Sequence, residues 1–132
     1  MDKKALRAMI REKKRQMTES EIRSRSEKLS ALLLETEAYR QAKTIYGYLS
    51  YNQEVRTLPI LEQALRDGKQ VAVPKVYGEE MRFIRMQDLT RVSKGYCGIP
   101  EPVDDGPLAN DKHALVLIPG LALDKEGQRI GY

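Results

Sequence analysis

The sequence predicts an α/β fold: a three-layer, Rossmann-like domain in which helices flank a mostly parallel sheet, with an N-terminal helical hairpin. Three observations favour this fold. Leu115–Ile118 is a short unbroken apolar run ended by Pro119-Gly120, which is typical of a strand buried on both faces. Residues 44–76 follow a strand–helix–strand pattern, and residues 2–37 show two helical patterns. With 132 residues, the chain has the size of one domain.

The first two helices are expected at residues 2–16 and 19–37, as an antiparallel pair. In the first helix, one side is apolar (Leu6, Met9, Ile10 and Met17) and an adjoining side is basic (Lys3, Arg7, Arg11 and Lys14). Such a basic stripe is either a solvated face or a patch that meets phosphate. Thr18-Glu-Ser-Glu21 has the capping-box pattern, so the second helix should begin directly after Thr18.

Residues 44–50 are rich in β-branched and aromatic side chains, which predicts the first strand. After a loop at residues 51–57, Thr57 can cap a helix that tolerates Pro59 in its first turn and ends at Gly68. Residues 69–76 are the next strand. The crossover rule makes these two strands parallel neighbours in a right-handed unit.

Residues 80–86 are expected to form an edge strand, possibly antiparallel, because only a short turn joins them to the previous strand. Residues 94–112 are punctuated by glycine and proline and predict a long surface connection. The apolar run at 115–118 then forms the last strand, and a glycine-containing loop follows it.

The composition is that of a globular protein, with 41% apolar and 32% charged residues. The chain has no apolar run long enough to cross a membrane and no signal-peptide core at its N-terminus, so we expect a cytoplasmic protein. Cys97 is the single cysteine, which excludes an internal disulfide. Residues 1–43 hold twelve Lys and Arg against seven Asp and Glu, whereas the remainder is nearly balanced, so an anionic partner is expected near the N-terminus.

Two loops at the carboxyl edge of the predicted sheet carry candidate site residues. The loop after Ile118 holds Gly120, Gly127 and Gly131 with two cations, Lys125 and Arg129, which is the chemistry of a phosphate site, although ordinary turn chemistry gives the same pattern. Glu54 follows the first strand at the same edge. Its carboxylate can accept hydrogen bonds from a heterocycle, or it is simply a solvated loop residue.

The other reactive side chains give weaker evidence of a functional role. His113 has no nucleophile beside it in a motif, and Cys97 lies in a turn of small residues with no evident base. Asp104 and Asp105 belong to an Asp-Asp-Gly turn, for which a structural role is the simpler interpretation.

The closing motif, Pro-Gly-x-Ala-x-Asp-x-x-Gly-x-Arg-x-Gly at residues 119–131, resembles the nucleotide loop of the 5-formyltetrahydrofolate cyclo-ligase family. The likeness continues along the chain in the family's order. It includes Lys3-x-x-Leu6-Arg7, Tyr48-Leu-Ser50 with Glu54-Val-x-Thr57, Val73-Pro-Lys75, Met81 to Phe83, Gly98-Ile-Pro-Glu-Pro102 and Ile118-Pro-Gly120.

The resemblance implies an ATP-dependent ligase that closes the ring of 5-formyltetrahydrofolate, a small-molecule substrate, to give 5,10-methenyltetrahydrofolate. It implies that ATP is bound by Lys3, Lys4, Arg7, Arg129 and Gly131, with Arg129 catalytic. Leu49, Glu54, Pro100 and Glu101 would meet the folate. Magnesium is implied as well, but the family's metal-binding aspartate lies in a Gly-x-Gly-Tyr-Tyr-Asp segment beyond Tyr132, so no metal ligand is named.

For the same reason, residues 1–132 are expected to form one α/β domain that lacks the C-terminal part of the family. Two alternatives stay open: a non-enzymatic basic module that binds nucleic acid, and a phosphosugar isomerase on a similar fold. The first lacks aromatic residues among the N-terminal cations, so no nucleic-acid partner is expected. The second needs a general base, and only Glu54 or His113 is available.

Overall fold

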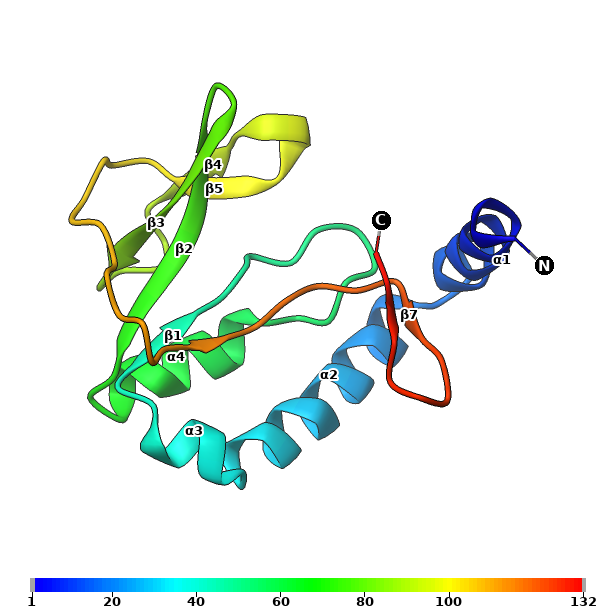
Figure 1. The fold of residues 1–132 in the computed structure, drawn as a ribbon, viewed down its shortest axis with the longest axis horizontal. Coiled ribbons are helices and arrows are strands. Elements are labelled where there is room, and N and C mark those ends of the chain that lie inside the picture. The colour runs from blue at the N-terminus through cyan, green and yellow to red at the C-terminus, as the bar shows by residue number, and fades with distance from the viewer. Residues whose placement is uncertain (1, 132) are drawn as a thin grey trace.

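The computed structural model describes residues 2–131, which are built around a four-stranded sheet (Figure 1). The strand order is β3 (Glu80–Met86), β2 (Gln70–Tyr77), β1 (Thr44–Tyr46) and β6 (Leu115–Val116). β1 is parallel to both β2 and β6, whereas β3 is antiparallel to β2 at the edge of the sheet. The predicted α/β class, the parallel pairing of the first two strands and the antiparallel edge strand are confirmed.

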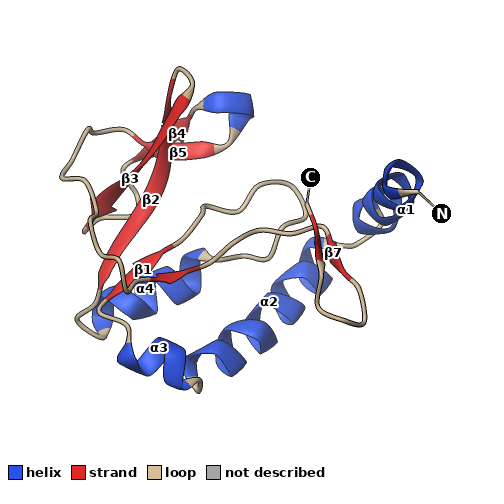
Figure 2. Cartoon of the chain, viewed as in Figure 1, coloured by secondary structure: helices blue, strands red, loops and turns tan. Residues whose placement is uncertain are grey.

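Three helices share one core with this sheet: α2 (Glu19–Leu34), α3 (Glu37–Gln41) and α4 (Leu58–Arg66). Figure 2 shows them together on one side of the strands. Leu61 and Ala64 of α4 are fully buried against Val71 and Val73 of β2. Within residues 2–131, the helical layer therefore lies on one face of the sheet, and the second helical layer of a three-layer fold is not among the described elements.

The opposite face of the sheet carries a ring stack between Tyr46 and Phe83, whose centroids are 4.8 Å apart. Tyr46 pairs with Ala72, and Phe83 pairs with Pro74. Because side chains alternate along a strand, both rings lie on the face opposite to Val71 and Val73. Residues 107–111 cross this face. In this segment, the backbone N–H of Ala109 donates to the carbonyl of Phe83, and the backbone N–H of Asp111 donates to the Tyr46 hydroxyl.

The capping box at Thr18 is confirmed, since the Thr18 hydroxyl accepts a hydrogen bond of 3.1 Å from the backbone N–H of Glu21. The second helix was predicted to reach residue 37 but ends at Leu34. The reason is a second cap: the Thr36 hydroxyl accepts from the N–H of Tyr39 and begins α3. An N-cap residue has extended backbone angles, so the chain turns there.

α1 (Lys3–Arg15) begins after Asp2, whose carboxylate accepts from the N–H of Ala5, and none of its residues is buried. Figure 1 shows α1 almost end-on, whereas α2 runs across the view. The predicted antiparallel hairpin is therefore not confirmed. Leu6 and Ile10 of the predicted apolar side are half-buried, as are Arg7 and Lys14 of the basic stripe, whereas Met9 is exposed.

Two strand predictions were wrong in their extent. The first strand ends at Tyr46 rather than at residue 50. Beyond it, the predicted side-chain cap of α4 is also absent at Thr57, because the Thr57 hydroxyl donates instead to the carbonyl of Tyr48 at 2.5 Å. The last strand was predicted to be buried on both faces. β6 comprises only Leu115 and Val116 at a sheet edge, and Ile118 beyond it is 63% exposed.

The long connection predicted at residues 94–112 holds some regular structure. β4 (Val92–Lys94) pairs antiparallel with β5 (Pro100–Pro102), and a 3-10 turn, η1 (Tyr96–Gly98), joins them. At the C-terminal end, β7 (Ala122–Leu123) pairs with β8 (Arg129–Ile130) to form a small hairpin.

Two tyrosines make the fold sensitive to alkaline pH. Burial, and then the charge of Glu54, raise the pKa of Tyr48 to about 12. Burial and a 2.6 Å hydrogen bond to Asp67 also raise the pKa of Tyr39. Because both pKa values are higher in the folded chain than in the unfolded one, the stability that these phenols contribute is complete below about pH 10 and is lost as the pH rises through the folded values.

We therefore expect the urea midpoint of unfolding to fall between pH 10 and pH 12. Measuring it at half-unit steps for the native chain and for Tyr48→Phe tests this. The variant should lose less stability over this range, and equal losses would contradict the assignment to Tyr48.

Candidate active site

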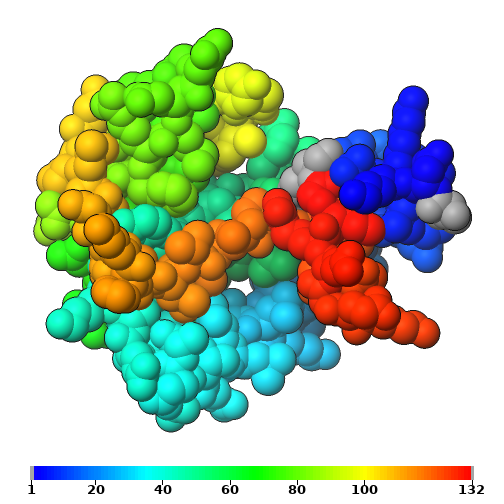
Figure 3. Space-filling model, in the orientation of Figure 1, coloured from blue at the N-terminus to red at the C-terminus, as the bar shows by residue number. Residues whose placement is uncertain are grey.

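Three segments that lie far apart in the sequence meet at one end of the molecule: α1, the loop at residues 51–57 and the closing loop at residues 119–131. In Figure 1, the loop between β1 and α4 reaches toward the C-terminal end, and Figure 3 shows the closing segment lying against α1. A cavity of about 520 Å³ opens where they meet. Its lining comprises Arg11, Lys14, Arg15, Tyr51, Asn52, Gln53, Glu54, Ile99 and Leu121.

The closing loop is folded around its own polar groups. The Asp124 carboxylate accepts hydrogen bonds from the N–H groups of Glu126 and Gln128, at 3.0 and 2.7 Å. Gly127, between them, has a φ of +83°, a left-handed conformation that favours glycine. These contacts fix the turn from β7 to β8 and so bring Arg129 back toward the start of the loop.

Arg129 lies across two glycines of the predicted phosphate loop. A Cβ added at Gly131 would be 3.2 Å from Nη2 of Arg129, and one added at Gly120 would be 3.3 Å from its Cγ. The Nε group donates to the carbonyl of Pro119 at 3.2 Å. Both glycines are therefore in close contact with the arginine side chain, and a Cβ at either position would require Arg129 to shift by a few tenths of an ångström.

The opening helix is attached to this loop by an arginine. Nε of Arg7 donates to the carbonyl of Gly131 at 2.9 Å, a contact that joins residues 124 positions apart. Arg7 is half-buried, whereas Lys3 and Lys4 are exposed in the first turn of α1. The structure thus brings together Arg7, Gly131 and Arg129, two guanidinium groups beside a glycine loop, which is an arrangement suited to a phosphate group.

Glu54 is fixed within its own loop. Its Oε1 accepts a hydrogen bond of 2.7 Å from the N–H of Tyr51, and its own N–H donates to the carbonyl of Tyr51 at 3.1 Å. Asn52 adopts a φ of +52°, which asparagine tolerates better than most side chains. The residue is half-buried and lines the cavity.

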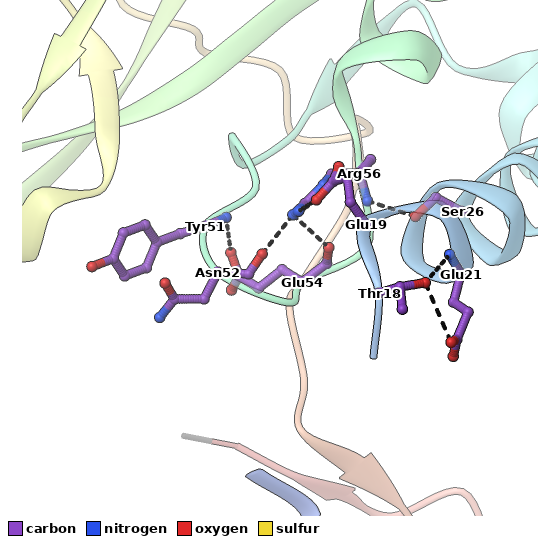
Figure 4. A network of polar contacts seen from close by, with 8 residues as sticks. All are labelled: Thr18, Glu19, Glu21, Ser26, Tyr51, Asn52, Glu54 and Arg56. Carbon is purple, nitrogen blue, oxygen red and sulfur yellow. Dashed lines mark hydrogen bonds and ion pairs between the residues drawn. The ribbon is translucent and has the colours of Figure 1, made fainter. Parts of the chain in front are cut away.

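Arg56 connects this loop to α2, as Figure 4 shows. Its guanidinium donates to the carbonyls of Asn52 and Glu54, at 2.7 and 3.2 Å, and pairs with Glu19 at 3.0 Å. Its backbone N–H donates to the hydroxyl of Ser26, which is buried in α2. The ion pair lowers the pKa of Glu19. No signal in the sequence indicates the role of Arg56, because Glu19 is 37 positions away and no local motif joins them.

The other predicted residues lie elsewhere. Leu49 packs in the hydrophobic core. Pro100 and Glu101 belong to β5, and the Glu101 carboxylate accepts from the N–H of Val76 at 3.0 Å. A Cβ at Gly95 would be 2.0 Å from the same carboxylate, so Glu101 fixes β5 against β2 and the η1 turn. Ile99, directly before Pro100, lines the cavity.

The remaining reactive side chains stand apart from the cavity. His113 and Cys97 are exposed. Asp104 pairs with Arg91 at 2.7 Å, and this contact lowers the pKa of Asp104. Asp105 accepts from the Tyr77 hydroxyl and pairs with Lys75 at 3.0 Å, and these two contacts lower the pKa of Asp105. The two aspartates therefore anchor the connection after β5.

Within residues 2–131, no group of three or more His, Cys, Asp or Glu side chains is arranged to hold a metal ion. None of the helices described there has the length and apolar character needed to cross a membrane. The expected cytoplasmic location stays a prediction.

Comparison with known proteins identifies relatives of this chain. The profile of the 5-formyltetrahydrofolate cyclo-ligase family matches residues 1–132. The mouse 5-formyltetrahydrofolate cyclo-ligase is 25% identical over 138 residues, an alignment that covers 98% of this chain and 68% of the mouse protein.

Two solved structures are also similar. The 5,10-methenyltetrahydrofolate synthetase of Aquifex aeolicus matches all of this chain and 68% of its own, with a TM-score of 0.86 and 31% identity. The synthetase of Mycoplasma pneumoniae shares the fold, with a TM-score of 0.69, 24% identity and coverage of 72% of its chain. The chain thus spans about two thirds of these relatives, and its sequence and fold place it in the 5-formyltetrahydrofolate cyclo-ligase family.

Proposed function

We propose that the protein closes the ring of 5-formyltetrahydrofolate to 5,10-methenyltetrahydrofolate in a reaction that converts ATP to ADP and phosphate. The family match over residues 1–132 carries this proposal. The contact between Arg7 and Gly131 supports it, because it joins the two segments that the family resemblance assigns to the nucleotide. The match also favours an enzyme over the nucleic-acid module and the isomerase.

The chemistry explains why the site is rich in cations. A formamide oxygen is a poor leaving group, and transfer of the γ-phosphoryl group to it creates a good one. The second folate nitrogen then attacks the formyl carbon, loses its proton, and the oxygen departs with phosphate. Such phosphoryl transfer is accelerated mainly by positioning and by neutralising charge on the phosphate oxygens. No protein nucleophile is required, which agrees with the exposed positions of His113 and Cys97.

In this proposal, Arg7 and Gly131 bind the ATP phosphates, with Lys3 and Lys4 nearby in the first turn of α1. Arg129 is the catalytic residue, since its guanidinium lies over Gly131 and can neutralise the transferred group. Glu54 accepts hydrogen bonds from the folate ring. Leu49, Pro100 and Glu101 are outside the cavity lining, so they would act on the folate indirectly, through the packing around the cavity. Leu49 is in the core, and the Glu101 carboxylate already accepts a hydrogen bond from Val76.

In this proposal, magnesium arrives with the nucleotide. It usually keeps several water ligands and binds through substrate phosphates with one or two carboxylates. Bound there, magnesium would neutralise phosphate charge, and the arginines would orient the same phosphates.

The reaction is tested by mixing the purified protein with 5-formyltetrahydrofolate, ATP and magnesium and following the absorbance of methenyl-folate. We expect the absorbance to rise only with ATP, with one ADP formed per methenyl-folate. A protein that binds both ligands but forms neither product would contradict the proposal.

Arg56 is a positioning residue for the folate, because it fixes the loop that carries Glu54. Replacing Arg56 with alanine removes two hydrogen bonds to that loop and one ion pair. At a net cost of about 1.4 kcal/mol, the dissociation constant for 5-formyltetrahydrofolate should rise about tenfold. Titration calorimetry measures this change, and the affinity for ATP should stay within twofold.

The matched control is Arg25→Ala, an exposed arginine on the same helix as Glu19. Arg56→Lys keeps the charge but not the forked geometry, so it should recover only part of the loss. Equal folate affinity in Arg56→Ala and the native chain would show that the loop does not depend on this contact.

A further inference from the structure

We infer that Glu101 is a positioning residue for the folate: its carboxylate fixes the η1 turn beside the cavity and does not touch the substrate. This inference rests on the proposed function and deepens it, because it makes the position of one hairpin, β4–η1–β5, a determinant of folate affinity. The inference assigns that position to a contact among three residues, Glu101, Val76 and Gly95.

The tip of this hairpin lies against the loop that carries Glu54. Ile99, which follows η1 directly, lines the cavity together with Tyr51 and Glu54. A Cβ added at Gly98 would be 3.5 Å from the Tyr51 hydroxyl, which is ordinary van der Waals contact. In Figure 4, the Tyr51 ring extends away from Arg56 and toward the yellow ribbon of the hairpin. A shift of the hairpin would therefore change the wall of the cavity at both Ile99 and Tyr51.

Glu101 joins this hairpin to the central sheet. β1 pairs with β2 only along Gln70–Ala72, and beyond Ala72 no other described strand pairs with that side of β2. The Val76 N–H, which needs an acceptor, donates at 3.0 Å to Oε2 of Glu101. The carboxylate thus takes the place of a strand carbonyl, and it holds β5 to a fixed backbone group of β2.

The second carboxylate oxygen fixes the start of the turn. A Cβ at Gly95 would be 2.0 Å from Oε1 of Glu101 and 2.2 Å from its Cδ, so the carboxylate fills the space that a side chain at residue 95 would need. The Gly95 N–H donates to the carbonyl of Ile99 at 2.9 Å, which closes the turn. The position of Ile99 therefore follows from how Gly95 packs on Glu101.

These contacts distinguish Glu101 from a carboxylate that acts on the substrate. Glu101 is half-buried and lies outside the lining of the cavity, whereas Glu54 lines it. One oxygen of Glu101 is bonded to β2 and the other packs against Gly95. What the site requires at residue 101 is therefore a hydrogen-bond acceptor of the right shape, and the negative charge is not needed.

Titration calorimetry with 5-formyltetrahydrofolate tests this inference on three variants. Glu101→Ala should weaken folate binding by about tenfold, because the hydrogen bond that holds the hairpin is lost. Gly95→Ala should cause a similar loss, because its methyl group displaces the carboxylate. Glu101→Gln should bind folate within about twofold of the native chain, since its amide oxygen can still accept from Val76. ATP affinity should stay native in all three, which general damage to the fold would not allow.

The double variant Gly95→Ala, Glu101→Ala shows whether the two residues act through one contact. If they do, the losses are not additive, and the double variant should bind folate about as weakly as Glu101→Ala alone. The matched control is Glu79→Ala, which removes an exposed glutamate from the turn between β2 and β3 and should keep native affinity. Thermal melting of each variant shows that it folds.

A loss in Glu101→Gln as large as that in Glu101→Ala would show that the charge acts on the folate and would overturn the inference. Additive losses in the double variant would overturn it as well, because Gly95 would then act independently of the carboxylate. If the native protein and all variants bind folate equally well, the inference fails while the proposed function stands. If the native protein binds no folate, both fail.

Discussion

Replacing Arg7 with methionine is expected to weaken ATP binding by about tenfold to a hundredfold. Arg7 joins α1 to the closing loop, since its Nε donates to the carbonyl of Gly131. A hydrogen bond from a charged donor contributes about 1.5–3 kcal/mol, and its loss leaves the phosphates with one guanidinium, that of Arg129, instead of two. Titration calorimetry with ATP and magnesium measures the change.

Two further variants separate the role of the charge from that of the fold. Arg7→Lys keeps a cation but loses the planar fork, so it should bind ATP with intermediate affinity. Arg25→Met removes an exposed arginine of α2 and should bind ATP as the native chain does. Native ATP affinity in Arg7→Met would place the nucleotide away from α1 and would remove the main structural support for the proposed site.

The elements that the sequence predicts best are those whose signals are local. The start of α2 follows from the hydroxyl of Thr18 and the pattern after it, and the antiparallel pairing of β2 with β3 follows from the short turn between them. Each of these features depends on residues only a few positions apart. Local chemistry alone therefore suffices to predict them.

The elements predicted poorly depend on distant partners. The apolar run 115–118 has the composition of a central strand, but its burial depends on what pairs with the other side of β6, and Val116 is 44% exposed. Thr57 has the composition of a helix cap, but the carbonyl of Tyr48 competes for its hydroxyl. In both cases, tertiary contacts override the local preference.

The residues of the candidate site also differ in whether a local motif predicts them. The closing motif predicts Arg129 and its glycines, and the structure adds that the arginine lies against both Gly120 and Gly131. Arg56 could not be assigned from a motif, because its partner Glu19 is 37 positions away, in α2.

Replacing Glu54 with glutamine should lower kcat/KM for 5-formyltetrahydrofolate by about tenfold to a hundredfold, the second large effect expected at this site. Glutamine has nearly the same shape, and its amide oxygen can still accept from the N–H of Tyr51, so the loop should keep its fold. What is lost is the negative charge at the cavity wall, and hydrogen bonds to a charged acceptor contribute about 1.5–3 kcal/mol.

Steady-state kinetics with varied folate, at saturating ATP, measure the effect, and Glu62→Gln on the exposed side of α4 is the matched control. If the carboxylate serves only to close its own loop, Glu54→Gln should be as active as Glu62→Gln, because the amide preserves that contact. A selective loss in Glu54→Gln, with native stability and native ATP affinity, would instead show that the charge acts on the substrate. The loop geometry favours this second outcome, since Tyr51 bonds one carboxylate oxygen, Oε1, while the side chain still lines the cavity.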